Sequence, residues 1–240
     1  MCIVVYYWLK REPQAGRERR REVSQMKQTE PYVITISRML GSGGVIIGRQ
    51  LSEKLNIAYF DKEIVSKAAD EFGLMEEDLQ RYDEKRASFW DSLLRSSMMK
   101  TPDSYGNPLY NLPSDRQLVE AERKIIRTIA AEHSAVIIGR GGVHVLHDHP
   151  RHISIFLHCE VKTRQQRVQE LLKVTEKEAK RMIAENDLKR GQHFQLFTDR
   201  PWTDARQYTL CIDTGKIGLD RSASLILECV EEHLGIKPQA

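Results

Sequence analysis

The sequence predicts an α/β domain in which helices cover both faces of a parallel β-sheet. The first observation is a series of short apolar runs, rich in valine and isoleucine, that recur along the chain. Runs of this kind are typical of strands buried on both faces. The second observation is that the intervening segments carry apolar residues three or four positions apart, which is the spacing of one helix face. Strands that alternate with helices predict a parallel sheet.

The apolar runs place five strands, and the spacing between them places the helices. The strands are expected at residues 32–37, 56–60, 135–139, 153–157 and 208–212. The helices are expected over about residues 44–55, 62–72, 115–132, 160–172, 175–189 and 221–233. Thr175 and Glu178 have the form of a capping box, which marks the start of one of these helices.

Two segments depart from this alternation. Residues 76–114 begin with a helix-like stretch and end in a loop with three prolines, so we expect an insertion between core elements. Residues 1–30 are charged and arginine-rich, so we expect a disordered or non-native extension before a domain of residues 31–240. An arm that binds an anionic surface or nucleic acid, and a translation start at Met26, are the alternative interpretations.

Composition disfavours several classes of protein. The formal net charge of +3 is too small to indicate a nucleic-acid partner. No apolar run approaches the ~18 residues that a membrane span needs, so we expect no membrane partner. The cysteines lack CxxC spacing and predict neither a zinc ribbon nor a disulfide framework, which favours the reducing cytoplasm. Residues 144–152 are rich in histidine but have no supporting cysteines, and we expect no metal site there.

A glycine-rich turn follows the first predicted strand. Ligands of parallel α/β sheets bind beyond the carboxyl ends of the strands, and here that end carries Gly41-Ser42-Gly43-Gly44. Glycines permit a tight turn and a close approach of the backbone to a ligand. Unpaired amides at the start of the following helix favour an anion. The turn therefore predicts a phosphate site, with a plain strand-to-helix connection as the alternative.

The turn does not match the phosphate-loop pattern GxxxxGK[ST]. With Gly43 aligned to the second glycine, Gly44 takes the lysine position and Val45 takes the hydroxyl position. Arg38 stands where the first glycine belongs. Loss of one preorganised charge stabiliser can cost ~10²–10³ in rate. Arg38, at the end of the strand, is the nearest replacement cation.

The other strand ends carry charged residues. Asp61 follows the second strand, where it could bind a sugar hydroxyl, a base or a metal shell, or cap the next helix. Arg140 follows the third strand between glycines, a position suited to bidentate phosphate contact. A helix break is expected within residues 186–202, and it predicts a mobile basic lid or a solvated helix end. The cations of this segment are Lys189, Arg190, His193 and Arg200.

Five stretches, in order, resemble the cytidylate kinase-like proteins, relatives of bacterial cytidylate kinase among the P-loop nucleoside monophosphate kinases. They are ITISRMLGSGG, YFDKEIV, VIIGRGG, IFLHCEVKTRQQRV and YTLCIDTGKIGLD. The resemblance runs from about Val33 to Leu234. It implies a P-loop NTPase-like three-layer sandwich with a five-stranded parallel sheet, a helical NMP-binding insertion and a lid. The kinase-like branch commonly reads GSGGR, and here Val45 stands in place of that arginine.

The resemblance also implies a role for each candidate residue. The residues that would hold the donor nucleotide are Gly41, Ser42, Gly43, Gly44, Val45 and Asp213. The residues that would bind the acceptor are Asp61, Arg140 and Asp187. The cations that would neutralise the transferred group are Arg38, Arg140, Lys189 and Arg190.

The activity implied is transfer of the ATP γ-phosphate to CMP or dCMP with Mg²⁺. The partners would be small nucleotides, and a homodimer is left open. Because the lysine and the hydroxyl are both absent, a catalytically impaired nucleotide-binding or regulatory protein is one alternative. A kinase for another small acceptor is the other.

Overall fold

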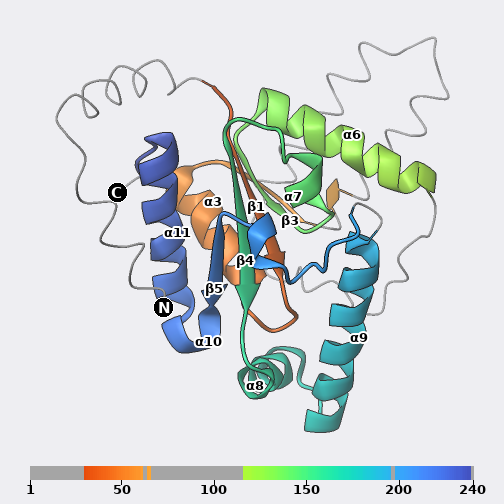
Figure 1. Cartoon of the computed structure of the whole chain (residues 1–240). Helices are drawn as coiled ribbons and strands as arrows, with labels where there is room; N and C mark the ends of the chain where they lie inside the picture. The colour runs from red at the N-terminus through yellow and green to blue at the C-terminus, as the bar shows by residue number, and fades with distance from the viewer. Residues whose placement is uncertain (1–29, 62–63, 66–115, 196–197, 239–240) are drawn as a thin grey trace.

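The computed structural model describes residues 30–61, 64–65, 116–195 and 198–238 (Figure 1). In these ranges five strands form one parallel sheet in the order β2-β3-β1-β4-β5. They are β1 (Val33–Arg38), β2 (Ala58–Phe60), β3 (Ala135–Ile138), β4 (His152–His158) and β5 (Leu210–Asp213). Because all pairs are parallel, the turns after β1 and β3 open at the same edge of the sheet.

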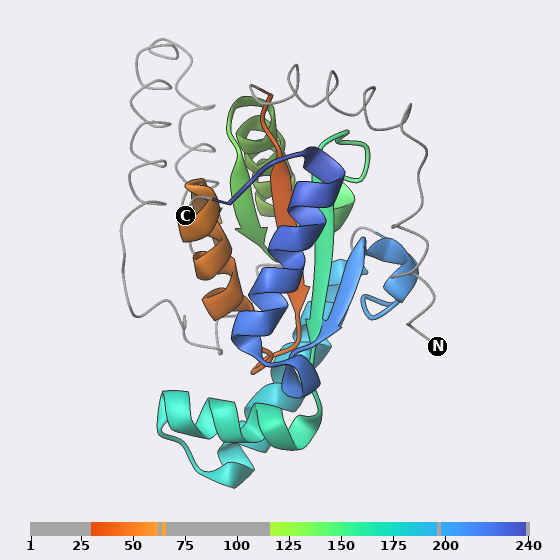
Figure 2. The same ribbon diagram turned by 90° about the vertical axis from the view of Figure 1, so that its left-hand side faces the viewer.

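Helices cover both faces of the sheet (Figures 1 and 2). They are α3 (Gly44–Leu55), α6 (Arg116–Glu132), α7 (Gly142–Val145) and α11 (Leu219–Leu234). On one face, α3 and α11 pack on a core that includes Ile36 and Ile155. On the other face, α6 and α7 enclose a core around Phe60 and Ile137. Successive strand side chains point to opposite faces, so each strand contributes to both cores. The predicted three-layer α/β sandwich is confirmed.

Two helices extend beyond the carboxyl ends of the strands (Figure 2). They are α8 (Val161–Leu172) and α9 (Glu176–Phe194). The two helices pack together through Val168, Ala179 and Ile183. Leu40, from the glycine turn after β1, packs against the same apolar cluster. The turn is therefore attached to the α8–α9 pair by a side chain of its own.

Most predicted elements are confirmed, with differences at their ends. The Thr175–Glu178 capping box opens α9 as expected. The strand β2 begins at Ala58 because Asn56 adopts a φ of 50° and caps α3. The strand β5 begins at Leu210, two residues later than expected. Three short elements were not predicted: α7, the 3-10 turn η2 (Ala205–Gln207) and α10 (Thr214–Ile217).

The helix end expected near Lys189 lies five residues too early, although the end found still falls within residues 186–202. The helix α9 continues without interruption to Phe194 and contains Gly191. A Cβ atom on Gly191 would lie 3.4 Å from the Trp202 ring, so this glycine lets an aromatic side chain approach the helix. A glycine inside a helical pattern can have such a packing reason instead of ending the helix.

Several predictions lie outside the described residues. These are the extension of residues 1–29, nearly all of the helix at 62–72 and the insertion at 76–114. Among the described helices, none has the length and apolar character needed to span a bilayer.

Candidate phosphate-binding site

The turn between β1 and α3 has the backbone of an anion-binding loop. Gly41 and Gly43 have φ angles of 81° and 83°, and Gly43 is the N-cap of α3 with no side-chain cap. A Cβ atom on Gly41 would lie 2.8 Å from the Arg164 carbonyl oxygen, and one on Gly43 would overlap Leu219. The first amides of a helix have no acceptor within the helix. Together with the helix dipole, they favour an anion at this point.

The carbonyl oxygens of this turn are bonded to the protein. Each carbonyl oxygen from residue 38 to residue 43 accepts at least one hydrogen bond. The donors, in order, are Arg190 Nη1 (2.9 Å), Ser42 N and Oγ (3.2 and 2.8 Å), Arg164 Nη1 (3.3 Å), Arg167 Nη1 (3.3 Å), Thr214 Oγ1 (2.8 Å) and Ile47 N (3.0 Å). Because these oxygens are engaged, they do not oppose an anion in the turn, which can present its amides instead.

Residues of α8 and α9 hold the turn at Leu40. Asp187 Oδ1 accepts a hydrogen bond from the Leu40 amide (3.0 Å), and Arg164 donates to the Leu40 carbonyl. Arg164 and Asp187 also form an ion pair of 2.5 Å. Arg190 lies 3.8 Å from Asp187, and burial lowers its pKa to about 9, an effect that Arg38 adds to and Asp187 opposes. The expected lid residues Asp187 and Arg190 therefore contact the glycine turn itself.

The Arg38 side chain crosses from the end of β1 over the start of α3. Its Cγ atom lies 2.8 Å from the position that a Cβ atom on Gly44 would occupy. Its Nη1 atom occupies the space beside Gly139, in the turn after β3. Burial lowers the pKa of Arg38; Tyr59 and Asp61 attract its charge, and Arg140 repels it. The guanidinium thus lies between the two glycine-rich turns.

Arg140 is tied to a carboxylate inside the protein. Its Nη1 atom lies 2.9 Å and 3.1 Å from the two carboxylate oxygens of Glu122 on α6. The side chains are 4% and 3% exposed, and the Arg140 Nη2 atom has no hydrogen-bond partner among the described residues. Burial lowers the pKa of Arg140, and Glu122 opposes that shift. The arginine that we expected to contact a phosphate therefore has most of its charge balanced internally.

The remaining candidates either cap helices or lack the side-chain groups that a phosphate loop usually supplies. Asp61 is buried, and its Oδ1 accepts from the Ile64 amide (3.2 Å), which is the capping role considered from sequence. Asp213 Oδ1 caps α10 by accepting from two of its amides (3.0 and 3.3 Å). Val45 is half-buried and offers no hydroxyl, while the buried Ser42 hydroxyl donates to Met39. Lys189 is half-buried on α9.

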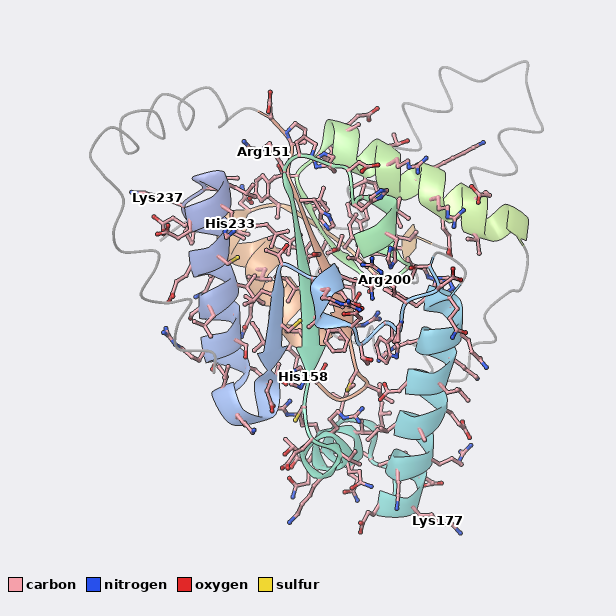
Figure 3. All side chains as sticks on the ribbon, viewed as in Figure 1. Arg151, His158, Lys177, Arg200, His233 and Lys237 are labelled. Atoms are coloured by element: carbon pink, nitrogen blue, oxygen red, sulfur yellow. The ribbon has the colours of Figure 1, made fainter. Side chains whose placement is uncertain are left out.

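The cations of the expected lid segment are not gathered at one place. Figure 3 shows Arg200 beside the C-terminal end of α9, and Lys177 at the opposite end of that helix. Arg200 is exposed, and it contributes to the lowered pKa of His144, which burial mainly causes. Only Asp187 and Arg190 of this segment contact the glycine turn among the described residues. No group of three metal-ligating side chains occurs in the part of the chain that the structure describes.

A match to a protein-family model shows which family the chain belongs to. The model of the cytidylate kinase-like family matches residues 33–216. The chain belongs to this family. In this cytidylate kinase-like protein the glycine turn follows β1, the central strand of the sheet.

Solved structures include further similar proteins. An uncharacterized protein from Eubacterium ventriosum is 25% identical, with a TM-score of 0.63, over 83% of this chain and 98% of that one. A shikimate kinase from Bacteroides thetaiotaomicron is 15% identical, with a TM-score of 0.44, over 83% and 98%. A gluconokinase from Sinorhizobium meliloti is 12% identical, with a TM-score of 0.44, over 87% and 96%. No curated protein matches.

Four residues of this cytidylate kinase-like protein escaped sequence reasoning. Arg164, Arg167 and Thr214 bind carbonyl oxygens of the glycine turn, and Glu122 balances Arg140. Arg164 and Arg167 are one turn apart at the start of the helix after β4, which is the one sequence signal they carry. Thr214 comes directly after Asp213, at the end of a predicted strand.

Proposed function

We propose that this protein is a nucleoside monophosphate kinase-like phosphotransferase that transfers the γ-phosphate of ATP to CMP or dCMP. The observation that carries the proposal is the glycine turn after β1, with uncapped helix amides and fully engaged carbonyl oxygens. In-line phosphoryl transfer asks the protein mainly for positioning and charge neutralisation. A turn of this kind serves the first need, and the neighbouring arginines serve the second.

The proposed roles are those that the family resemblance implies. Residues 41–45 bind the donor phosphates through their amides, and Arg38 supplies charge beside them. Lys189 and Arg190 would add further positive charge near the transferred group, and Arg140 would add what its pairing with Glu122 leaves. The resemblance assigns Asp61 and Asp187 to the acceptor and Asp213 to the adenine, and Asp187 also holds the glycine turn at the Leu40 amide.

The described residues fit the phosphates better than they fit the metal. The amides of the turn suit an anion. Mg²⁺ commonly takes one or two carboxylates together with substrate phosphates. Val45 offers no oxygen where P-loops place their hydroxyl. We therefore assign Mg²⁺ to the substrate phosphates, whose charge it would neutralise, and name no protein ligand for it.

The test is ADP formation with each nucleoside monophosphate in turn. We expect ATP-dependent turnover that is fastest with CMP or dCMP. The absence of turnover above the blank with every acceptor, including a panel of other small metabolites, would refute the kinase proposal. Turnover with a metabolite outside the nucleotides would keep the reaction and change the acceptor.

The absent lysine and hydroxyl favour one other function, a nucleotide-binding or regulatory protein without catalysis. Calorimetry would then detect ATP binding while no acceptor is phosphorylated. ATP-dependent phosphorylation of any small acceptor would exclude it. The cytoplasmic location and the homodimer stay predictions, which fractionation and the mass of the native particle would check.

A further inference from the structure

We propose that Arg38 supplies the positive charge that the P-loop lysine usually provides, and that glycine at position 44 leaves space for the Arg38 side chain. The two positions are therefore coupled. The claim that Arg38 binds phosphate rests on the proposed function. The claim that Arg38 and a side chain at position 44 compete for space does not. In the pattern GxxxxGK[ST], glycine stands at the position of Arg38 and lysine at that of Gly44. The two residue types have changed places.

Space is the first argument. Gly44 has no positive φ and lies in α3, so its backbone does not require glycine. Its surroundings do, because a Cβ atom there would lie 2.8 Å from Arg38 Cγ and 3.0 Å from Arg38 Cβ. The second distance is fixed by the β1 backbone, which no side-chain rotation can change. A side chain at 44 is therefore tightly crowded by a side chain at 38, and most of all by the Arg38 Cγ atom.

The direction of the guanidinium is the second argument. From Gly44 the Arg38 side chain continues to Gly139, whose missing Cβ leaves the space that Nη1 fills. This path ends between the two glycine-rich turns, where Asp61, after β2, attracts the charge. Arginine adds a planar fork of donors suited to phosphate oxygens.

The neighbouring arginines supply the third argument. Arg140 is paired with Glu122, and Arg164 is paired with Asp187. The arginines that bond carbonyl oxygens of the turn or of Thr214 are Arg164, Arg167 and Arg190. In the described part of the chain, Arg38 is the arginine beside the turn whose guanidinium has no protein acceptor. It is therefore the cation most available to a bound phosphate.

A stability cycle tests the claim about space without any assay of function. The variants are Gly44→Ala, Arg38→Gly and the two combined, each melted against wild type. We expect Gly44→Ala to lower Tm by roughly 3–10 °C in the wild-type background, because it overpacks the contact with Arg38. In the Arg38→Gly background the same change should have no cost, since alanine suits a helix better than glycine. An equal Tm loss in both backgrounds would overturn the coupling.

A binding cycle tests the charge. Calorimetry with a non-hydrolysable ATP analogue should give Arg38→Gly an affinity ~10–100-fold below wild type. The double variant Arg38→Gly/Gly44→Lys should bind at least tenfold more tightly than its matched control Arg38→Gly/Gly44→Ala, which has the same space and no cation. Equal affinities of these two double variants would overturn the exchange of charge.

The two outcomes remain distinguishable from failure of the proposed function. If wild type binds the analogue but phosphorylates no acceptor, the kinase proposal fails and both cycles still report on positions 38 and 44. If wild type binds no analogue, the claim that Arg38 binds phosphate is wrong as well, and the melting cycle alone decides the claim about space.

Discussion

Two turns of this protein have the same glycine pattern and different surroundings. Residues 41–44 read GSGG after β1, and residues 139–142 read GRGG after β3. In both, the first and third residues of the pattern are glycines with positive φ angles, 81° and 83° in the first turn and 78° and 65° in the second. In both, the third residue of the pattern is the N-cap of the following helix and has no side-chain cap. The two backbones differ at the second position, because Arg140 also has a positive φ (54°) and Ser42 does not.

The two turns differ in the helix that each one opens and in the charge that each one carries. The first turn opens the 12-residue α3, while the second opens only the 4-residue α7. The second position of the pattern is Ser42 in one turn and Arg140 in the other, and the Arg140 charge is balanced by the buried Glu122. The glycine pattern therefore specifies the positive φ angles at its first and third positions, but not the surroundings of the turn. In our proposal the first turn, with a long helix and an available cation, binds the anion, whereas the second turn holds the internal ion pair of Arg140 and Glu122.

The largest expected effect comes from removing the buried Arg140–Glu122 ion pair. Glu122→Gln should lower the free energy of unfolding by about 3–5 kcal/mol, because it leaves the buried Arg140 charge without a partner. Glu120→Gln, at a largely exposed position on the same helix, is the matched control and should cost less than about 1 kcal/mol. Urea denaturation measures both. Equal small losses would mean that the second turn holds no anchored charge, and the contrast between the turns would disappear.

The next effect compares how the two turns contribute to ATP binding. Gly43→Ala and Gly141→Ala each force alanine into a positive φ angle, which costs about 1–2 kcal/mol in stability. Gly43→Ala should also weaken binding of ATP at least tenfold, because it distorts the amides that hold the phosphates. Gly141→Ala should leave ATP affinity unchanged. Thermal melts and calorimetry on the two variants give the comparison, and equal losses of affinity would contradict it.

The smallest effect concerns the bonds that occupy the carbonyl oxygens of the first turn. Thr214 is fully buried and donates to the Ser42 carbonyl oxygen. Thr214→Val keeps the shape and removes the hydroxyl, which should cost about 1 kcal/mol and raise the KM for ATP more than it lowers kcat. Thr214→Ser retains the donor and should behave like wild type. A valine variant with unchanged KM would show that the turn holds its shape without this bond.

The sequence was sufficient for the sheet and for the location of the first turn. Strands buried on both faces leave a simple apolar signal, and a glycine cluster after a strand is easily recognised. The pairing of Arg140 with Glu122 was not predictable, since it joins α6 to the turn after β3 by a contact that exists only after folding. The path of Arg38 over Gly44 depends on a side-chain conformation, and the bond from Thr214 to Ser42 spans 172 positions of sequence.

The most direct test of the central claim is a crystal structure with a non-hydrolysable ATP analogue. The exchange of Arg38 and Gly44 predicts that the β- and γ-phosphates bind the amides of Gly43 and Gly44 and accept hydrogen bonds from the Arg38 guanidinium. An analogue bound away from this turn, or one bound there without contact to Arg38, would contradict the account.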